Sequence, residues 1–535
     1  MPPPRPHRPV PPRVAWWVTF ALLTLAGAAW SLATPLLSGA DESDHAIRAA
    51  AVVRGQPVGG ATSELLGSRN VFIDVEVPEA YGSARSSATC FIDYADSPAA
   101  TPFDALGPPP ECTPLEGGRD RITTTTLQYR GQPSYYAVVG LPTLLWPDGT
   151  GIAAMRLVSA ALTAALLASA LAAARAAGSR RLALAVLAGA TPVCLWLSGQ
   201  VNTGGFEVAA AALVWAAGIV VARAPVVTGR DVTRLGAGLA LLTVVRGLSP
   251  AYAAGALVVL AVLAGRPRLR ELAARSDVRR WGVAVAVAWV ASVAWLAYIQ
   301  LRYPLDPRPG SGLDHALGEW SWYVRQTVGV FGVNDVVTPW PPVVAWWLVV
   351  AGLVAVGLRR ATAVERAVVV LLGVGGYAMN FTAEGMSLPP IGYFWQGRYV
   401  LPALVGVAIL ASGLEIGRPA APEARTPEGG ADVVRTGVVP LAVGAAVLVG
   451  VHGWAFAHVA RHMAGQGTTL GYLDALRDPV WRSPLLPSWA WLAVYVLALA
   501  ATAAVALLPP SGAPSSNDAG RAPTVGARGR DGDST

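Results

Sequence analysis

The chain has 535 residues, of which 53% are hydrophobic and only 14% are charged. Soluble proteins usually carry about 25% charged residues, so this composition excludes an ordinary soluble domain and indicates a chain that faces lipid, where ionised groups are costly. The net charge of +7 comes from arginines scattered between apolar segments rather than from a basic domain, so we expect no nucleic-acid partner.

Apolar runs dominate the sequence. A bilayer-spanning helix needs about 20 mostly apolar residues, and about twelve runs meet or approach that length, which predicts an all-α polytopic membrane protein. Two of them, 235–246 and 251–264, are short and predict either two short spans or one broken hairpin. The runs cover residues 14–37, 152–173, 182–197, 206–222, 235–246, 251–264, 281–301, 343–358, 367–381, 399–414, 437–456 and 490–508.

The N-terminal tail, residues 1–13, precedes the first apolar run, 14–37. Arg5, Arg8 and Arg13 before an apolar stretch resemble the start of a signal peptide. The run is longer than a typical signal sequence, and no clear cleavage site follows it. We therefore expect 14–37 to be retained as the first transmembrane helix, with residues 1–13 as a cytoplasmic tail.

Arginine clusters occupy every second connection between the runs. Such clusters favour the cytoplasmic side of a membrane, so their alternation predicts that both termini are cytoplasmic. Residues 135–508 form the multi-span domain under this topology, and the tail 509–535, rich in Gly, Ser, Pro and Asp, is predicted to be disordered. The clusters lie at residues 5–13, 175–181, 223–234, 266–280, 359–366, 418–435 and 521–530.

The opposite, extracytoplasmic side carries the long polar connections, of which 38–134 is the largest. This loop contains a strand-like segment at 71–77 and two cysteines, Cys90 and Cys112, so we expect it to be partly folded. Cysteines on this side meet an oxidising compartment, and a Cys90–Cys112 disulfide would add about 3 kcal/mol of stability in the entropic account. The alternative is two unpaired thiols. The apolar segment 135–146 is too short to span and predicts an interfacial or re-entrant helix.

The first group of reactive side chains follows the first span directly, at 41–45, which reads Asp-Glu-Ser-Asp-His. Carboxylates here can act as a general base or bind a divalent cation, with Asp41 and Asp44 as the candidate metal ligands. Residues 46–54 predict an amphipathic helix along the membrane interface. The alternative is a solvated helix start, whose acids only complement the helix dipole.

A second candidate is the segment 396–399, Gln-Gly-Arg-Tyr, at the outer end of a span. An arginine at this depth, Arg398, can clamp a phosphate group through two parallel hydrogen bonds. The alternative is an interfacial arginine that snorkels toward water beside the aromatic belt residue Tyr399.

Other polar side chains stand near the outer ends of spans. Glu207 and Arg246 lie in or beside apolar runs, where ionisable groups usually face a cavity or pair with each other, so a structural Glu207–Arg246 pair is the alternative to a substrate site. Asp335 ends a glycine-rich segment, 328–335, and is a candidate substrate ligand; the alternative is that the glycines only let a re-entrant loop turn. The set is completed by Arg156 and Asn202.

Several signatures are absent from the sequence. It contains no Walker motif, no Rossmann glycine fingerprint, no zinc-ligand spacing and no Gly-x-Ser-x-Gly elbow, which leaves an ATP-driven pump or a soluble-type nucleotide-sugar enzyme without support. The apolar segments show no convincing internal repeat, which disfavours an inverted-repeat transporter.

The pattern Asp41-Glu42-x-x-His45 after the first span is similar to a bacterial family of polytopic membrane proteins catalogued only as a domain of unknown function, and that family resembles the GT-C superfamily of membrane glycosyltransferases. This chain departs from the family at three places: Ser43-Asp44 replaces Pro-Ala, Thr203 replaces Pro, and Val333-Asn334 replaces Trp-Leu before Asp335. Further matching stretches lie at 132–136, 156–159, 201–207, 246–250, 330–335 and 396–402.

The resemblance implies a GT-C-like fold and the transfer of a sugar from a polyprenyl-phosphate donor to a cell-envelope glycan, lipid or protein, outside the bacterial plasma membrane. Asp41 would deprotonate or orient the acceptor hydroxyl, with Glu42 and His45 placing the acceptor or tuning Asp41. Arg398, with Arg246, would stabilise the phosphate leaving group. The remaining candidate substrate- or phosphate-binding residues are Asp44, Arg156, Asn202, Glu207, Asp335, Gln396 and Tyr399.

Two other classes of function remain open from the sequence. A lipid-linked glycan transporter or flippase would place ionisable residues near the membrane midplane, whereas most of these lie at outer span ends. A non-catalytic component of envelope assembly would use the first loop for docking and would need no active site. Neutral substitutions at Asp41 and Arg398 distinguish the enzyme from the scaffold.

Overall fold

A computed structural model describes residues 11–60, 62–63, 71–84, 115, 118–304, 312–386, 395–418, 430–465, 470–479 and 481–508. The two predicted terminal tails fall almost entirely outside these ranges. Cys90 and Cys112 also lie outside the described residues, so the disulfide stays a prediction. Cys194, the cysteine within the described part, is a free thiol buried in an apolar segment.

Each of the twelve predicted apolar runs contains helix. Within the described residues, nine helices are long and apolar enough to cross a membrane, or ten if a pair bent by 64° counts as one span. Two helices are shorter, with 15 and 13 residues, so the count of twelve spans is not confirmed. The helices are α1 (Pro12–Leu32), α5 (Gly149–Ala176), the bent pair α6 (Arg180–Gly189) and α7 (Pro192–Ser198), α8 (Thr203–Arg223), the short α9 (Gly229–Thr243), α10 (Ser249–Ala274), α11 (Ser276–Arg302), α14 (Trp340–Leu358), α15 (Ala363–Met386), the short α16 (Leu401–Gly413), α17 (Gly430–Gly465) and α19 (Ser488–Leu507).

The first helix ends earlier than the predicted 37, at Leu32. Pro35 disfavours helical backbone in the residue before it and has no N–H to donate. Leu37 has a φ of 68°, a left-handed conformation that an α-helix does not contain. The chain therefore leaves the helix and turns sharply before Asp41.

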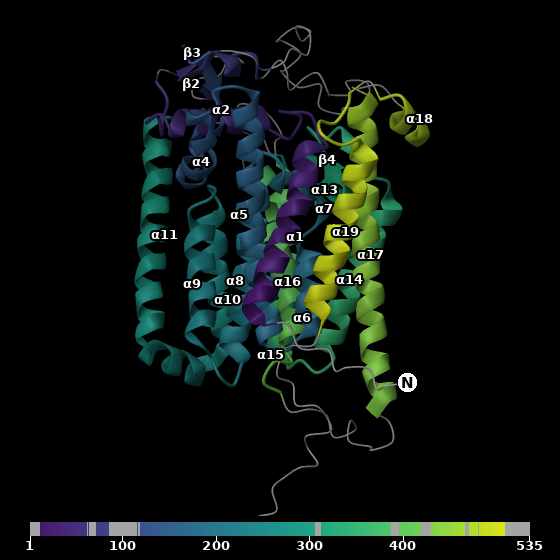
Figure 1. Ribbon diagram of the computed structural model, residues 1–535. Helices are drawn as coiled ribbons and strands as arrows, with labels where there is room; N and C mark the ends of the chain where they lie inside the picture. The colour runs from purple at the N-terminus through teal and green to yellow at the C-terminus, as the bar shows by residue number, and fades with distance from the viewer. Residues whose placement is uncertain are drawn as a thin grey trace, which may run out of the picture.

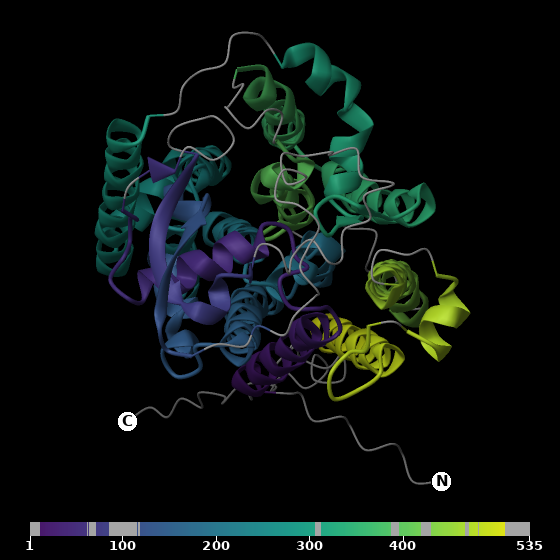
Figure 2. The same ribbon diagram turned by 90° about the horizontal axis from the view of Figure 1, so that it is seen from above.

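The helices stand side by side as one bundle around α8 (Figure 1). Helix α8 is buried along its whole length and packs against α5, α9, α10 and α16. The N-terminal helix α1 packs against both α5 and the C-terminal helix α19, so these first and last helices lie side by side in the bundle (Figure 2). This arrangement confirms an α-helical, multi-pass membrane fold.

Four of the seven predicted arginine clusters meet at one end of the bundle. Glu365 accepts hydrogen bonds from both Arg223 and Arg418, and Arg181 pairs with Glu415. These residues come from four separate segments that the sequence places on the same side of the membrane. Their contacts agree with that common placement, while its assignment to the cytoplasm stays a prediction.

The other end of the bundle is called the loop end below. A small domain with β2, β3 and α2 (Glu42–Val52), called the loop domain, lies at this end (Figure 1). The sheet is antiparallel, in the order β1 (Thr62–Ser63), β2 (Phe72–Pro78), β3 (Arg121–Thr126). Strand β2 confirms the predicted strand 71–77. Its alternate residues Ile73, Val75 and Val77 are buried, as the two-residue period of a half-covered strand requires.

Helix α2 corrects the prediction of an amphipathic helix on the membrane interface. The helix forms, but every residue from Glu42 to Ala51 is buried. Strands β2 and β3 pack on one side of it, and α4 (Ser134–Val139) packs on another. Its small alanines allow this close approach, so the helix is an internal element of the loop domain.

The predicted short helix at 135–146 is present as α4 followed by the 3-10 turn η5 (Leu141–Leu144). The two are separated at Gly140, where a Cβ would lie 2.4 Å from the carbonyl oxygen of Ala49 in α2. Glycine at this position therefore lets α4 approach α2. Leu144, Leu145 and Trp146 are exposed, which suits an interfacial location.

The remaining loop-end connections are also structured in part. They contain η2 (Glu79–Tyr81), η4 (Gln128–Arg130), α12 (Leu313–Gly318), α13 (Trp320–Gln326), the hairpin β4 (Val330–Phe331) and β5 (Val336–Val337), η6 (Gly397–Val400) and α18 (Tyr472–Arg477). The hairpin turns through positive φ values at Gly332 and Asn334. This agrees with the interpretation that the glycine-rich segment 328–335 provides a turn.

Candidate functional site

Helix α2 presents three functional side chains at helical spacing. Asp41 immediately precedes the helix, and His45 and Arg48 follow four and seven positions later, which places the three on one face. Tyr136 of α4 meets this face: its hydroxyl lies 2.6 Å from Nδ1 of His45. The guanidinium carbon of Arg48 lies 5.8 Å from the centre of the Tyr136 ring.

Asp41 has a strained backbone conformation, and its carboxylate has no hydrogen-bond or ion-pair partner among the described residues. Its φ of 55° places it in the left-handed region, which costs energy for any residue with a Cβ, although aspartate tolerates it better than most. The side chain is half-buried and does not cap α2. Its carboxylate forms no hydrogen bond or ion pair within the described residues. Strained residues of this kind cluster at functional sites.

Arg398 lies in η6, directly before α16, and is only 7% exposed. The turn that carries it is fixed, because the Gly397 N–H donates to Oε1 of Gln326 at 2.6 Å. The guanidinium lies beside the Tyr399 ring, 5.8 Å from its centre, and has no carboxylate or hydrogen-bond partner among the described residues. A buried cation without a counter-charge is costly, so this site favours an anionic ligand.

Arg246 lies in the turn between α9 and α10 and faces the same aromatic ring. Its guanidinium carbon is 4.5 Å from the centre of the Tyr399 ring, and its NH1 donates to Glu207 at 3.3 Å. The predicted Glu207–Arg246 pair is therefore present, and Ser249 also donates to Glu207 at 2.6 Å. The arginine side chain is still 32% exposed, which leaves donors free for a ligand.

The charges of this group act on each other. Burial, followed by the positive charges of Arg246 and Arg398, lowers the pKa of His45 to about 3, so the imidazole is neutral near pH 7. Burial raises the pKa of Tyr136, whose surrounding charges include Asp41 and Arg48. We call the set formed by Asp41, His45, Arg48, Tyr136, Arg246, Arg398 and Tyr399 the loop-end cluster.

Glu42 and Arg156 form a buried ion pair. Nε and NH2 of Arg156 donate to the two carboxylate oxygens of Glu42 at 2.6 and 2.5 Å, and both side chains are fully buried. NH1 and NH2 of Arg156 also donate to backbone carbonyls at the end of α1, and Glu42 also accepts from the Val201 N–H. Through these contacts the pair joins α1, α2, α5 and the α7–α8 turn. The predicted roles of Glu42 in placing the acceptor or tuning Asp41, and of Arg156 in binding substrate, stay predictions.

Asn202 and Asp44 are likewise used within the protein. Asn202 accepts from the Gly204 N–H at 2.8 Å as the cap of α8 and donates to the Ala40 carbonyl at 2.9 Å. Oδ1 of Asp44 accepts from the Leu127 N–H at 2.9 Å, which fixes the end of β3. The described residues hold no group of three or more His, Cys, Asp or Glu side chains suited to a metal ion, and the predicted divalent cation stays a prediction.

Asp335 and Gln396 complete the predicted set. Oδ1 of Asp335 accepts from the Val333 N–H at 2.9 Å within the β4–β5 turn, and Oδ2 lies 3.3 Å from Nε2 of His462. These two contacts place Asp335 in the β4–β5 turn beside α17. Gln396 is half-buried beside Arg398, and its Oε1 is buried without a partner in the described part.

Two members of the cluster, Arg48 and Tyr136, were not among the predicted site residues. The spacing of Asp41, His45 and Arg48 on one helix face is the signal that could have identified the arginine. Tyr136 lies in a segment that matches the family pattern, but nothing in the sequence indicates that its hydroxyl reaches His45, 91 positions earlier.

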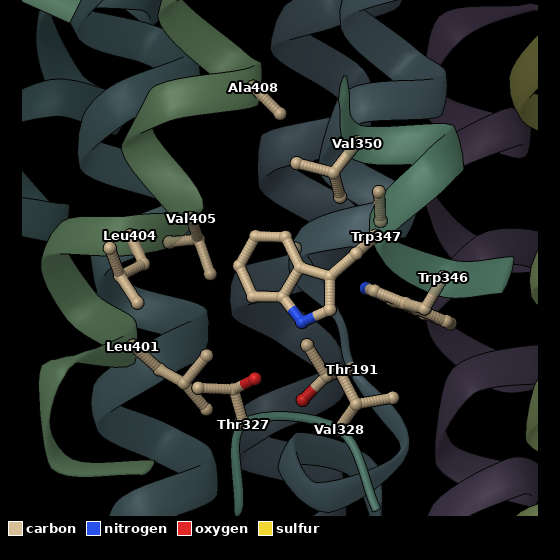
Figure 3. Close-up of a pocket in the computed structure, with 12 residues that line it drawn as sticks. Thr191, Thr327, Val328, Trp346, Trp347, Val350, Leu401, Leu404, Val405 and Ala408 are labelled. Carbon is tan, nitrogen blue, oxygen red and sulfur yellow. The ribbon is translucent and has the colours of Figure 1, made fainter. Parts of the chain in front are cut away.

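A narrow apolar pocket lies next to η6, between α6, α14 and α16. Leu401, Leu404, Val405 and Ala408 of α16 form one wall. Trp347 reaches across it, with its indole nitrogen on the side of Thr191 and Thr327 (Figure 3). The wall begins three residues after Arg398, so the apolar pocket continues inward from the cationic end of α16.

The fold and the site define a multi-pass α-helical membrane protein with a charged cluster at one end of its bundle. Residues 23–407 match the family described as "Predicted membrane protein (DUF2142)". The chain belongs to this family, and the matched range contains the whole loop-end cluster.

Two solved structures are also similar to this chain. They are crystal structures of ArnT from Cupriavidus metallidurans, one in the apo state and one bound to undecaprenyl phosphate. Each is 16% identical to this chain, covers 92% of it and is itself covered over 76% of its length, with TM-scores of 0.41 and 0.40. A comparison with curated proteins gave no match.

Proposed function

We propose that this protein is a GT-C-like glycosyltransferase that moves a sugar from a polyprenyl-phosphate donor to a cell-envelope acceptor on the outer face of the bacterial plasma membrane. One observation carries the proposal. Asp41 and Arg398 bear opposite charges without partners among the described residues, and they act on the hydrogen-bonded pair of Tyr136 and His45.

The first argument for the proposal is that Arg398 is suited to bind the phosphate group of the donor. Its guanidinium is buried without a carboxylate, and arginine binds phosphate oxygens through two parallel hydrogen bonds. Arg246 lies against the same Tyr399 ring, so an anion beside that ring meets two guanidinium groups. Both would stabilise the charge that develops on the leaving phosphate.

The second argument is that Asp41 is suited to accept the proton of the acceptor hydroxyl. In a single displacement, the acceptor oxygen bonds to the sugar's anomeric carbon while the bond from that carbon to the phosphate oxygen breaks. The bonding electrons leave with the phosphate, and the acceptor proton passes to the Asp41 carboxylate. That carboxylate is free of protein partners in the described part, as a general base requires.

The third argument is that the apolar pocket lies where the hydrocarbon chain of the donor would enter the bundle. A phosphate held at Arg398 keeps its hydrocarbon chain in the membrane, and the pocket wall of α16 starts at Leu401 and continues to Ala408. The pocket has a volume of about 20 Å³, room for about one water molecule. An isoprenoid chain laid along this wall, from the cationic turn into the bundle, would therefore need the neighbouring side chains to move. A larger side chain in this wall would fill the pocket and should therefore weaken binding of the donor.

The test is transfer from radiolabelled polyprenyl-phosphate sugars to envelope acceptors, with purified protein in lipid nanodiscs. An Arg398→Gln variant is compared with Arg119→Gln, a change at an exposed arginine of the loop domain. Transfer that only Arg398→Gln abolishes would support the enzyme. Movement of labelled lipid between leaflets without transfer would support a flippase, and the absence of both activities would support the scaffold.

A further inference from the structure

The contact between His45 and Tyr136 bears on which atom carries the imidazole proton. Nδ1 of His45 and the Tyr136 hydroxyl are 2.6 Å apart, and both side chains are buried. The rings are nearly parallel, with an angle of 22° and centres 5.8 Å apart. Within the described residues the hydroxyl has no other hydrogen-bond acceptor, so Nδ1 is the acceptor that this part of the protein offers to its proton.

A neutral imidazole has one donor nitrogen and one acceptor nitrogen. When Nδ1 accepts from Tyr136, the ring proton is on Nε2. No hydrogen bond of Nε2 occurs within the described residues, and Nε2 is not one of their buried unpaired polar atoms. An N–H on Nε2 is therefore without a protein partner in this part of the chain and is available to a ligand.

The surrounding charges oppose an imidazolium. Arg48 faces the Tyr136 ring from the same helix, and Arg246 and Arg398 act on His45 from the α9–α10 turn and from η6. The carboxylate in this group is Asp41, beside Tyr136. Glu207 is already paired with Arg246.

We propose that Tyr136 is a positioning residue that holds His45 as the neutral, Nε2-protonated tautomer, so that His45 donates an uncharged hydrogen bond to the phosphate oxygens bound by Arg246 and Arg398. His45 then takes no proton from the acceptor and gives none to the leaving group. The identity of the anion rests on the proposed function. The tautomer itself does not.

This role differs from that of an acid–base histidine. The phosphate of a glycosyl donor leaves as an anion that needs no proton, so an additional donor that is neutral adds stabilisation without a proton transfer. Nδ1 is occupied by Tyr136, which leaves Asp41 as the cluster's base. The Tyr136 hydroxyl acts only through the ring it orients.

The first test is nitrogen NMR of protein labelled at histidine, with His45→Gln used to assign the His45 signals. Wild-type protein should show Nδ1 without a proton and Nε2 with one, unchanged from mildly acidic to mildly alkaline pH. Tyr136→Phe should give a mixture of tautomers. A wild-type signal from an Nδ1–H tautomer, or from an imidazolium at neutral pH, would overturn the inference without any reference to activity.

The second test is binding of a sugar-free polyprenyl phosphate, which separates this inference from the proposed transfer. A hydrogen bond to a charged group is worth enough that its loss should weaken binding about tenfold. His45→Ala should show that loss, and His45→Gln, whose amide can donate from a similar position, should recover part of it. Unchanged affinity in folded His45→Ala would contradict the phosphate contact. If His45→Ala weakens binding and His45→Gln recovers part of it, but the wild type transfers no sugar, the proposed function is rejected and this inference is not.

Discussion

Arg156 holds Glu42 through two parallel hydrogen bonds while both side chains are withdrawn from solvent. Removing one member of a buried pair leaves an uncompensated charge or polar group and costs about 3–5 kcal/mol. We therefore expect Glu42→Gln and Arg156→Met to lower the thermal stability of the protein in detergent, measured by thermal unfolding.

The exposed pair Glu76 and Arg121, 3.8 Å apart, gives the matched control. Exposed pairs contribute about 0–1 kcal/mol, so Glu76→Gln should leave the unfolding temperature nearly unchanged. A Glu42→Gln protein that is as stable as wild type but has lost turnover would contradict the structural role and return Glu42 to the site.

Arg398 should determine affinity for the phosphate group. Loss of a charge-assisted hydrogen bond costs about 1.5–3 kcal/mol, so Arg398→Gln should bind polyprenyl phosphate about 10–100-fold more weakly. Arg398→Lys should recover part of the affinity because it restores the charge without the planar fork. Equilibrium binding in nanodiscs measures this, and equal affinity in Arg398→Gln and wild type would rule out the phosphate site.

His45 should make the protein less stable in acid. Its pKa lies near 3 in the folded protein, against an ordinary value of 6.5, so the unfolded chain binds the proton more readily. The free energy of unfolding should therefore fall as pH drops from about 6.5 toward 3. His45→Gln should reduce this slope, whereas a change at the exposed His315 serves as the control. An identical slope in wild type and His45→Gln, measured by chemical unfolding across this range, would show that His45 is not held neutral.

The pocket beside α16 should select for the lipid chain. Ala408→Trp would fill it, and the expected result is a greater loss of affinity for a long polyprenyl phosphate than for a short-chain prenyl phosphate. Leu371→Trp on the exposed surface of α15 is the control for added bulk. Equal losses for both chain lengths in Ala408→Trp would place the lipid chain elsewhere.

The helices follow from the sequence because lipid-facing segments leave a composition signal within each segment. The limits of that signal appear at α1, which Pro35 and Leu37 end early, and at α2. The alanine-rich sequence of α2, directly after a membrane span, predicts an interfacial helix as long as the strands that cover it are not known. Those strands come from residues 72–78 and 121–126, and their register depends on contacts between segments far apart in the chain.

The site was predicted in part for the same reason. Asp41, His45, Arg246 and Arg398 carry charges or protonatable groups at span ends, which the sequence displays directly. Whether a charge is already neutralised depends on distant partners: Glu42 meets Arg156 114 positions later. A residue such as Tyr136, whose role depends on one hydroxyl contact, gives no local signal.

Asp41 gives the most direct test of the central claim. Sugar transfer from a labelled polyprenyl-phosphate donor is measured for wild type, Asp41→Asn and Asp41→Gly, each checked for folding. Removing a general base typically slows a reaction by about 10²–10⁴-fold, and glycine relieves the left-handed strain at this position. The account predicts that both variants fold as well as wild type and lose transfer by at least that order. Transfer at the wild-type rate by folded Asp41→Asn would contradict it.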